Sequence, residues 1–313
     1  MTNSKSIFLA VGLTAAWLWN QSLLAQTGQP TTLAGVGNGA AWTDQQSAEW
    51  RFAFSSDYSA VDAGRVDYGG AKGNSGAQSA NANLSAVAPL KDGWFVPLEI
   101  SSRNVFLGQV TGAPVPSTID TLGLNAGLGY HIDDQWTVAG VAGPRFYRLD
   151  SVNSSGIGVG GMLRATYKWT PKLTLALGVA VNPDRDVPVL PLAGVRWEIC
   201  SNLTLSVMYP RSGLDYRVSS KLSVFAGFSG NFTVYRAESD LGNRIGMSQF
   251  NNGLGTYRDF HVGAGVEYRI VRGLSASVEG GYSFDRELDY ERIDQTVRFG
   301  NAPYVQAGLR VRF

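Results

Sequence analysis

The sequence predicts an all-β protein, a transmembrane antiparallel up-and-down β-barrel of about 14 strands. Three observations predict this fold. Apolar and polar residues alternate along most of the chain, short turns alternate with longer polar connections, and charged residues are scarce. Only 16% of the 313 residues are charged, 11% are aromatic and 38 are glycine. Beyond the N-terminal region no apolar run reaches the roughly 18 residues of a spanning helix, so strands would have to cross the membrane.

The N-terminal region has the three parts of a secretory signal peptide. Lys5 supplies the positive charge, an apolar core follows over 7–19, and Leu23-Leu24-Ala25 is a plausible cleavage site. The next residues are rich in Gln, Thr, Gly and Ala and show no periodicity. The predicted division is a signal peptide over 1–25, a short periplasmic lead-in over 26–48 and the barrel over 49–313.

A turn pattern recurs six times after the first strand: an apolar residue, three turn residues and another apolar residue. Three-residue loops are common hairpin connections, and an odd loop length places both flanking residues on the same face of the sheet. Counting outward in twos from each pair gives apolar residues, whereas the other face is small or polar. Short turns on one side and long loops on the other are typical of outer-membrane barrels. The six apolar pairs are Leu90 and Trp94, Ile132 and Trp136, Trp169 and Leu173, Ile199 and Leu203, Val218 and Leu222, and Ile270 and Leu274.

The last strand gives the clearest alternation in the chain. From Val305 to Phe313 apolar residues alternate with Gln306, Gly308, Arg310 and Arg312, which indicates one lipid-facing side and one wet side. A strand that ends on Phe313 resembles the terminal strand of bacterial outer-membrane β-barrels. The whole chain is similar to outer-membrane barrel families catalogued as domains of unknown function. That resemblance implies an outer-membrane location, contact with outer-membrane lipids, and assembly by the barrel assembly machinery through the C-terminal strand.

The strand count depends on one short stretch. Residues 203–209 and 214–218, joined by 210–213, are each shorter than the roughly 9–11 residues that a tilted spanning strand needs, and without them the count is 12. Two long Gly- and Asn-rich outer loops, predicted over 61–76 and 237–256, are candidate gates. The other long connections are predicted over 108–117, 150–156, 182–188 and 291–301.

Several classes of function are not supported. The net charge of +1 argues against a nucleic-acid partner. Cys200 is the only cysteine, so no internal disulfide forms, and the sequence shows no metal site and no cofactor motif. Glycines over 156–161 have the spacing of a dinucleotide fingerprint, but the residues after them alternate as a strand rather than opening a helix.

Charged residues on the inward face are the candidate lumen residues. One set lies on four strands that become consecutive when the barrel closes, and it is read as an ion-pair lattice or, alternatively, as a selective constriction. A second set lies on the opposite wall and leans basic, against Glu99 and Glu198, which predicts a mild anion preference if solutes pass. The first set is Glu49, Arg51, Glu267, Arg269, Glu279, Arg310 and Arg312; the second is Arg145, Arg164, Lys168 and Arg196.

The expected function is a passive pore or a small-solute transporter, and small solutes are the expected cargo. The alternative is a closed barrel with a structural or surface-interaction role. A third hypothesis, an outer-membrane lipid hydrolase, rests on His261, Ser283 and Asp285, because strand pairing would set His261 opposite Ser283 and Asp259 opposite Asp285. The simpler interpretation of these residues is a hydrogen-bonded polar rim, so no catalytic residue is predicted.

Overall fold

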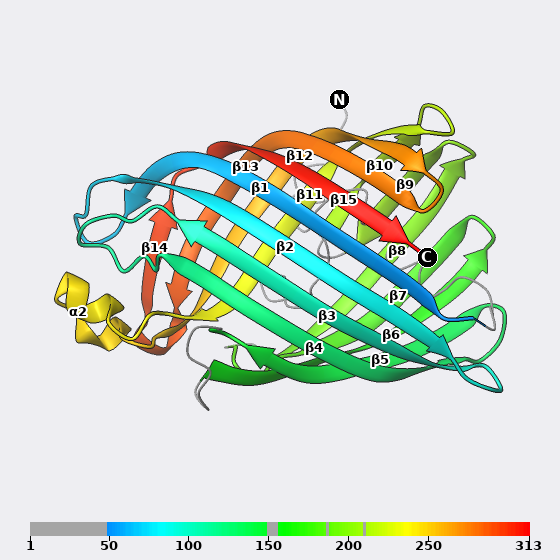
Figure 1. Ribbon diagram of the computed structural model, residues 1–313, viewed down its shortest axis with the longest axis horizontal. Coiled ribbons are helices and arrows are strands. Elements are labelled where there is room, and N and C mark those ends of the chain that lie inside the picture. Colours follow the sequence, from blue (N-terminus) through cyan, green and yellow to red (C-terminus); the bar gives the residue numbers. More distant parts are fainter. Residues whose placement is uncertain (1–48, 149–155, 186–187, 209–210) are drawn as a thin grey trace, which may run out of the picture.

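The alternating segments form one wall of antiparallel strands that closes on itself (Figure 1). The structure, a computed structural model, describes residues 49–148, 156–185, 188–208 and 211–313. The signal peptide and the lead-in predicted for the first 48 residues therefore lie outside the described residues. The first eight strands are β1 (Arg51–Asp67), β2 (Asn74–Pro89), β3 (Trp94–Leu107), β4 (Thr118–His131), β5 (Trp136–Phe146), β6 (Ile157–Thr170), β7 (Leu173–Val181) and β8 (Val189–Cys200). The remaining strands are β9 (Leu203–Met208), β10 (Arg211–Arg217), β11 (Leu222–Arg236), β12 (Leu254–Val271), β13 (Leu274–Tyr290), β14 (Gln295–Phe299) and β15 (Ala302–Arg312).

The fifteen strands occupy 14 positions in the wall. Both β14 and β15 pair with β13 on one side and β1 on the other, so they form a single interrupted wall strand. Closure occurs between β1 and β15, from Ala53 opposite Arg312 to Val61 opposite Tyr304. The predicted all-β barrel of 14 strands is confirmed. Within the described residues, no helix is long and apolar enough to cross a membrane.

The outer face of the wall carries the apolar half of the alternation. On β15, Val305 is 54% exposed whereas Gln306 is 2% exposed and faces inward. Near the short turns, aromatic side chains gather on the outside: Trp94 lies 4.7 Å from Tyr130 and Trp136 lies 4.6 Å from Tyr167, between ring centroids. Such a band is the interfacial girdle of a membrane barrel. The wall is therefore of the outer-membrane type, with its short turns on the periplasmic side.

The six predicted turns are all present at one end of the barrel. In three of them the apolar residues bracket the turn directly, as where the Leu90 amide donates to the Trp94 carbonyl at 2.8 Å. In the other three the register shifts by one residue beside the turn, so that Val271 pairs with Leu274. Gly273 accommodates this with a φ of 84°, which residues other than glycine rarely adopt. The bulge keeps both flanking residues on the outer face.

Two predicted loops at the outer end are partly strand. The loop predicted over 61–76 is wrong for most of its length, because β1 continues to Asp67 and β2 begins at Asn74. A register shift between Val61 and Gly64 changes which residues face inward and interrupts the alternation. The connection predicted over 291–301 contains β14, which pairs with the outer ends of β13 and β1.

The barrel wall is shorter along the barrel axis between β8 and β11 than elsewhere. The two strands between them have only six and seven residues, and Arg211 to Gly213, predicted as a loop, belong to β10. Beyond Ser229, β11 pairs with β12 alone among the described strands. Its outer half leaves the wall and crosses toward β3, where the Arg103 Nη1 donates to Thr233 Oγ1 at 2.8 Å. The barrel mouth is therefore narrowed from inside by its own strand.

Candidate functional site in the lumen

The interior has three layers along the barrel axis. An apolar core fills the outer end and buried polar and charged side chains occupy the middle. At the periplasmic end, the described residues line two charged recesses. Because inward residues of a barrel wall form the lumen, any solute path through the barrel has to pass these layers in turn.

The outer layer resembles the core of a soluble protein. Tyr290 is fully buried, with its ring centroid 4.9 Å from that of Phe250 and 5.8 Å from that of Tyr235, and its hydroxyl donates to the Pro114 carbonyl at 2.7 Å. The core also includes Leu241 of the short helix α2 (Leu241–Ile245). These residues come from five separate segments of the chain, and together they close the outer end.

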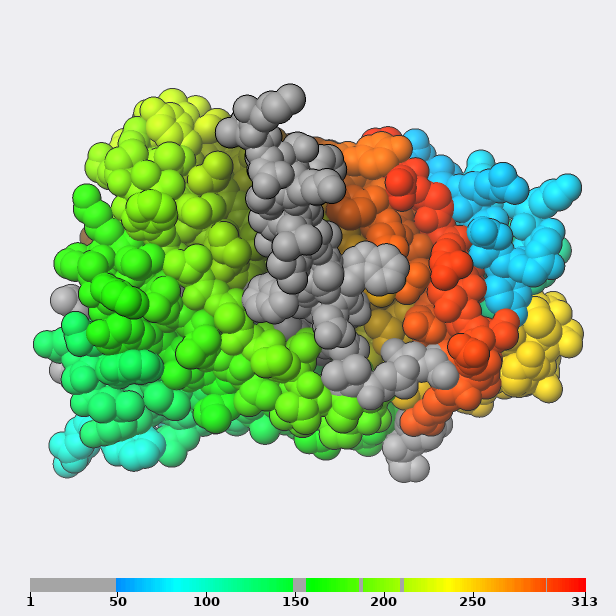
Figure 2. Space-filling model, turned by 180° about the vertical axis from the view of Figure 1, so that it is seen from behind, coloured from blue at the N-terminus to red at the C-terminus, as the bar shows by residue number. Residues whose placement is uncertain are grey.

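Polar contacts fasten the outer loops over this core. The Glu238 carboxylate accepts from the Ser117 amide at 2.8 Å and pairs with the Arg244 Nη2 at 2.8 Å. The Tyr68 hydroxyl, in the turn after β1, contacts the Met247 sulfur at 3.8 Å; burial raises the pKa of this hydroxyl, which keeps it protonated. Figure 2 shows the β1–β2 turn beside α2 at this end. The loop predicted over 237–256 is thus an ordered part of the closure.

An ion pair spans the middle layer. Arg211 of β10 places its Nη2 3.1 Å from the Glu279 Oε2 of β13, and both side chains are buried. The Tyr304 hydroxyl of β15 donates to the other oxygen of Glu279. Strands β11 and β12 separate β10 from β13 in the wall, so this contact bridges two intervening strands on the inside of the barrel.

A second polar chain crosses from β1 to β11. The Asn81 amide donates to Asp57 at 2.8 Å, the Arg103 Nε donates to the Asn81 carbonyl oxygen at 2.9 Å, and its Nη1 reaches Thr233. Three strands of one wall are thereby linked to the inward-bent strand β11. The middle of the lumen is held by directional hydrogen bonds between opposite walls.

The residues of the hydrolase hypothesis do not form a triad. His261 lies opposite Ser283 as predicted, but its Nε2 lies 2.9 Å from the Oδ2 of Asp259. Asp285 is in a bulge with a φ of 49° and instead pairs with Arg258 at 3.3 Å. The predicted pairing of Asp259 with Asp285 is therefore wrong, because the register shifts between Arg258 and Phe260.

Several polar atoms of the middle layer make no hydrogen bond to the protein. Among the described residues these include the Arg211 Nε and Nη1, the Arg286 Nε and Nη2, and the Ser283 Oγ. Buried groups of this kind are normally satisfied by water. The middle layer is thus polar enough to hold water between its side chains.

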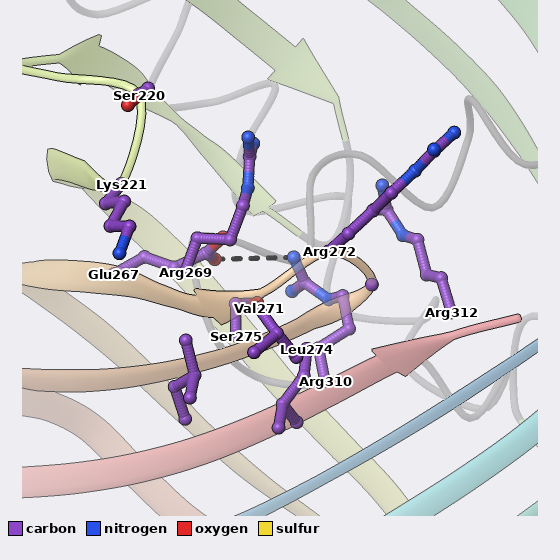
Figure 3. A pocket seen from close by; sticks show the side chains of 12 residues that line it. Ser220, Lys221, Glu267, Arg269, Val271, Arg272, Leu274, Ser275, Arg310 and Arg312 are labelled. Atoms are coloured by element: carbon purple, nitrogen blue, oxygen red, sulfur yellow. Dashed lines mark hydrogen bonds and ion pairs between the residues drawn. The ribbon is translucent and has the colours of Figure 1, made fainter.

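The first periplasmic recess has a volume of about 410 Å³ and is strongly basic (Figure 3). At its inner edge, the Arg310 Nη1 lies 3.4 Å from the Glu267 Oε2. Arg269 and Arg312 also line it, so β12 and β15 each contribute two inward charges here. Lys221 and Arg272 add two charges from the neighbouring turns.

The second periplasmic recess has a similar volume, about 400 Å³, and a different lining. It contains Glu49 and Arg51 of the first predicted set together with Asp92 and His131. The His131 ring lies 4.9 Å from the Phe95 ring and its Nδ1 lies 2.9 Å from the Thr137 Oγ1. Acidic, basic and aromatic side chains are mixed in this recess.

The second predicted set is not gathered into one site. Arg145 is buried against Gly160, where a methyl group would lie 2.5 Å from its Nε. Arg164 is on the same wall and is partly exposed. Arg196 and Glu198 form a loose pair of 3.9 Å near the periplasmic rim. The roles predicted for these residues stay predictions.

Sequence reasoning missed three residues that hold the middle layer. The sequence predicts a loop at Arg211, and no local pattern distinguishes Tyr304 or Arg103, although all three have inward positions. Tyr304 lies an even number of residues before Arg310, so the sequence places both side chains on the inward face. This is the one feature of the sequence that points to Tyr304. Contacts across the lumen join distant strands and leave no local pattern.

The profile of one protein family, described as Domain of unknown function (DUF6268), matches residues 91–312. No curated protein matches the chain. Among solved structures, a Pseudomonas aeruginosa FadL homologue has a TM-score of 0.48 at 12% identity, covering 93% of this chain and 96% of that one. The CymD monoaromatic hydrocarbon channel has a TM-score of 0.47 at 10% identity, covering 90% and 93%. An outer membrane channel from Pseudomonas putida F1 has a TM-score of 0.45 at 11% identity, covering 87% and 98%.

Proposed function

The chain belongs to the family Domain of unknown function (DUF6268), and since that description assigns no activity, we propose a function from the lumen itself. The protein is a passive outer-membrane pore or small-solute transporter. Its aqueous path runs from the periplasmic recesses through the polar middle layer. The outer core is the barrier in the conformation described.

One observation carries this proposal: charged side chains from strands that are not neighbours meet inside the middle of the lumen. A buried ion pair such as Arg211 with Glu279 is seldom more stable than apolar residues of the same size. A barrel that served only as a scaffold would gain nothing from it. Charges that meet inside a polar lumen can separate and admit solute, which supports a conducting role.

The closed outer end favours the alternative, a non-conducting structural or surface-interaction barrel. The two proposals differ in what an isolated barrel does in a planar bilayer. We expect the refolded protein to give discrete conductance steps, and a variant with Arg310→Ser and Arg312→Ser to give steps of altered ion selectivity. Silence of both proteins would contradict the pore and favour the structural role.

We propose no catalytic activity for the barrel. Ser283 is fully buried, and Asp285 pairs with Arg258 while His261 contacts Asp259. Turnover of a short-chain ester by the refolded wild type that is lost in His261→Ala would overturn this.

Export and assembly are proposals from the two ends of the sequence. The residues up to Ala25 would direct export and be removed, which N-terminal sequencing of protein from isolated outer membranes tests. Phe313 is 71% exposed at the rim, and its amide donates to the Phe52 carbonyl at 3.0 Å. We expect Phe313→Ser to reduce the assembled fraction in cells through weaker engagement of the barrel assembly machinery, and Arg312→Ser to leave it unchanged.

A further inference from the structure

The basic recess holds more positive charge than its own residues neutralise. Its lining includes five cationic side chains and a single carboxylate, that of Glu267. Glu267 is already paired with Arg310, the most buried of the five. Within the described part of the chain, the side chains of Lys221, Arg269, Arg272 and Arg312 form no ion pair. The four remaining charges therefore face the recess without a counter-charge.

These four groups come from separate elements that the fold brings together. Arg269 and Arg312 are inward positions on β12 and β15, while Lys221 and Arg272 are in the turns that flank β11 and β12. The Arg269 amide donates to the Lys221 carbonyl at 2.7 Å, which joins the backbones of these two residues. The Arg312 amide donates to the carbonyl of Gly273, the residue after Arg272, at 2.7 Å. Figure 3 shows Arg269, Arg272 and Arg312 extending to the same side of the barrel wall.

Holding like charges close together costs free energy unless an anion balances them. Guanidinium groups bind carboxylates and phosphates through two parallel hydrogen bonds, and several of them together favour a ligand with several acidic groups. The neighbouring recess has a similar volume but mixes Glu49 and Asp92 with Arg51, so the basic character is particular to one sector of the entrance.

We propose that the basic recess binds small soluble anions that carry two or more carboxylate or phosphate groups. Anion binding is inferred from the recess alone. That the recess is a loading site for solutes rests on the proposed pore function. The ligand is a soluble anion rather than a lipid headgroup, because Arg269, Arg310 and Arg312 face the lumen and not the lipid.

Calorimetric titration of citrate into the refolded protein in uncharged detergent tests the binding. We expect saturable binding that weakens as salt is raised, and an affinity for acetate at least about tenfold lower because fewer arginine contacts form. Arg269→Gln with Arg312→Gln should lower the citrate affinity by at least about tenfold. Arg51→Gln in the neighbouring recess is the matched control and should leave it unchanged. Absence of saturable citrate binding, or equal loss in the control, would overturn the inference.

Reversal potentials in a gradient of potassium chloride, across bilayers of uncharged lipid, separate this inference from the pore. We expect anion preference in the wild type and a shift toward cations in the same double variant. Citrate binding without any conductance would keep the recess as an anion site and contradict the pore. Conductance without citrate binding would support the pore and contradict the anion site.

Discussion

The two ends of the barrel differ in what fills them: the outer end holds an apolar core and the periplasmic end holds open charged recesses. At the outer end Phe250, Tyr290 and their neighbours exclude water, as in a soluble domain. At the periplasmic end the recesses stay open, and Lys221, Arg272 and other charged groups line them. An apolar core is stabilised by burial and opens only as a unit, whereas charged walls depend on hydration and salt. We therefore propose that the barrier lies at the outer end and the solute-facing chemistry at the periplasmic end.

The largest expected effect lies between the two ends, at the ion pair of the middle layer. Arg211→Ala leaves the buried Glu279 carboxylate without its cation, and we expect a loss of about 3–5 kcal/mol in the free energy of unfolding. Urea unfolding in micelles, followed by tryptophan fluorescence, measures it.

The control for this pair removes both charges. Arg211→Leu combined with Glu279→Leu should recover most of the loss, since replacing a buried pair by apolar residues is often neutral. If the double variant were as unstable as Arg211→Ala, packing and not charge would explain the effect.

A smaller effect is expected from the outer core. Tyr290→Phe keeps the ring but leaves the Pro114 carbonyl without its donor, which should cost about 1–3 kcal/mol. Tyr58→Phe is the matched control, because the Tyr58 hydroxyl donates to Gln78 at an exposed position. This variant should change the free energy of unfolding by less than about 0.5 kcal/mol. Equal losses in the same unfolding assay would mean that the outer end is not a distinct core.

The smallest effect is expected at the periplasmic rim. Glu198→Gln removes a loose pair with Arg196 whose side chains are 49% and 34% exposed, and we expect less than about 1 kcal/mol, decreasing with added salt. A larger loss that persists in high salt would show that the periplasmic end is as tightly organised as the outer end.

The same contrast explains what the sequence could predict. In the periplasmic half the alternation is regular apart from one-residue shifts beside three turns, so the turns, the outward aromatics and the inward positions of Glu267, Arg310 and Arg312 follow from counting in twos. In the outer half, register shifts near Val61 and Arg258 reverse the parity, and counting in twos fails beyond them. The apolar core joins segments far apart in the chain, which no local pattern encodes.

The position of the barrier can be tested by removing the outer loop. The Ala237 amide donates to the Gly253 carbonyl at 2.8 Å, so the residues between them can be replaced by an Asn-Gly turn without separating β11 from β12. We predict that this deletion, which removes Leu241 and Phe250 from the core, gives a larger single-channel conductance than the wild type in a planar bilayer. Equal conductance, or none in either protein, would contradict an apolar barrier at the outer end of a conducting lumen.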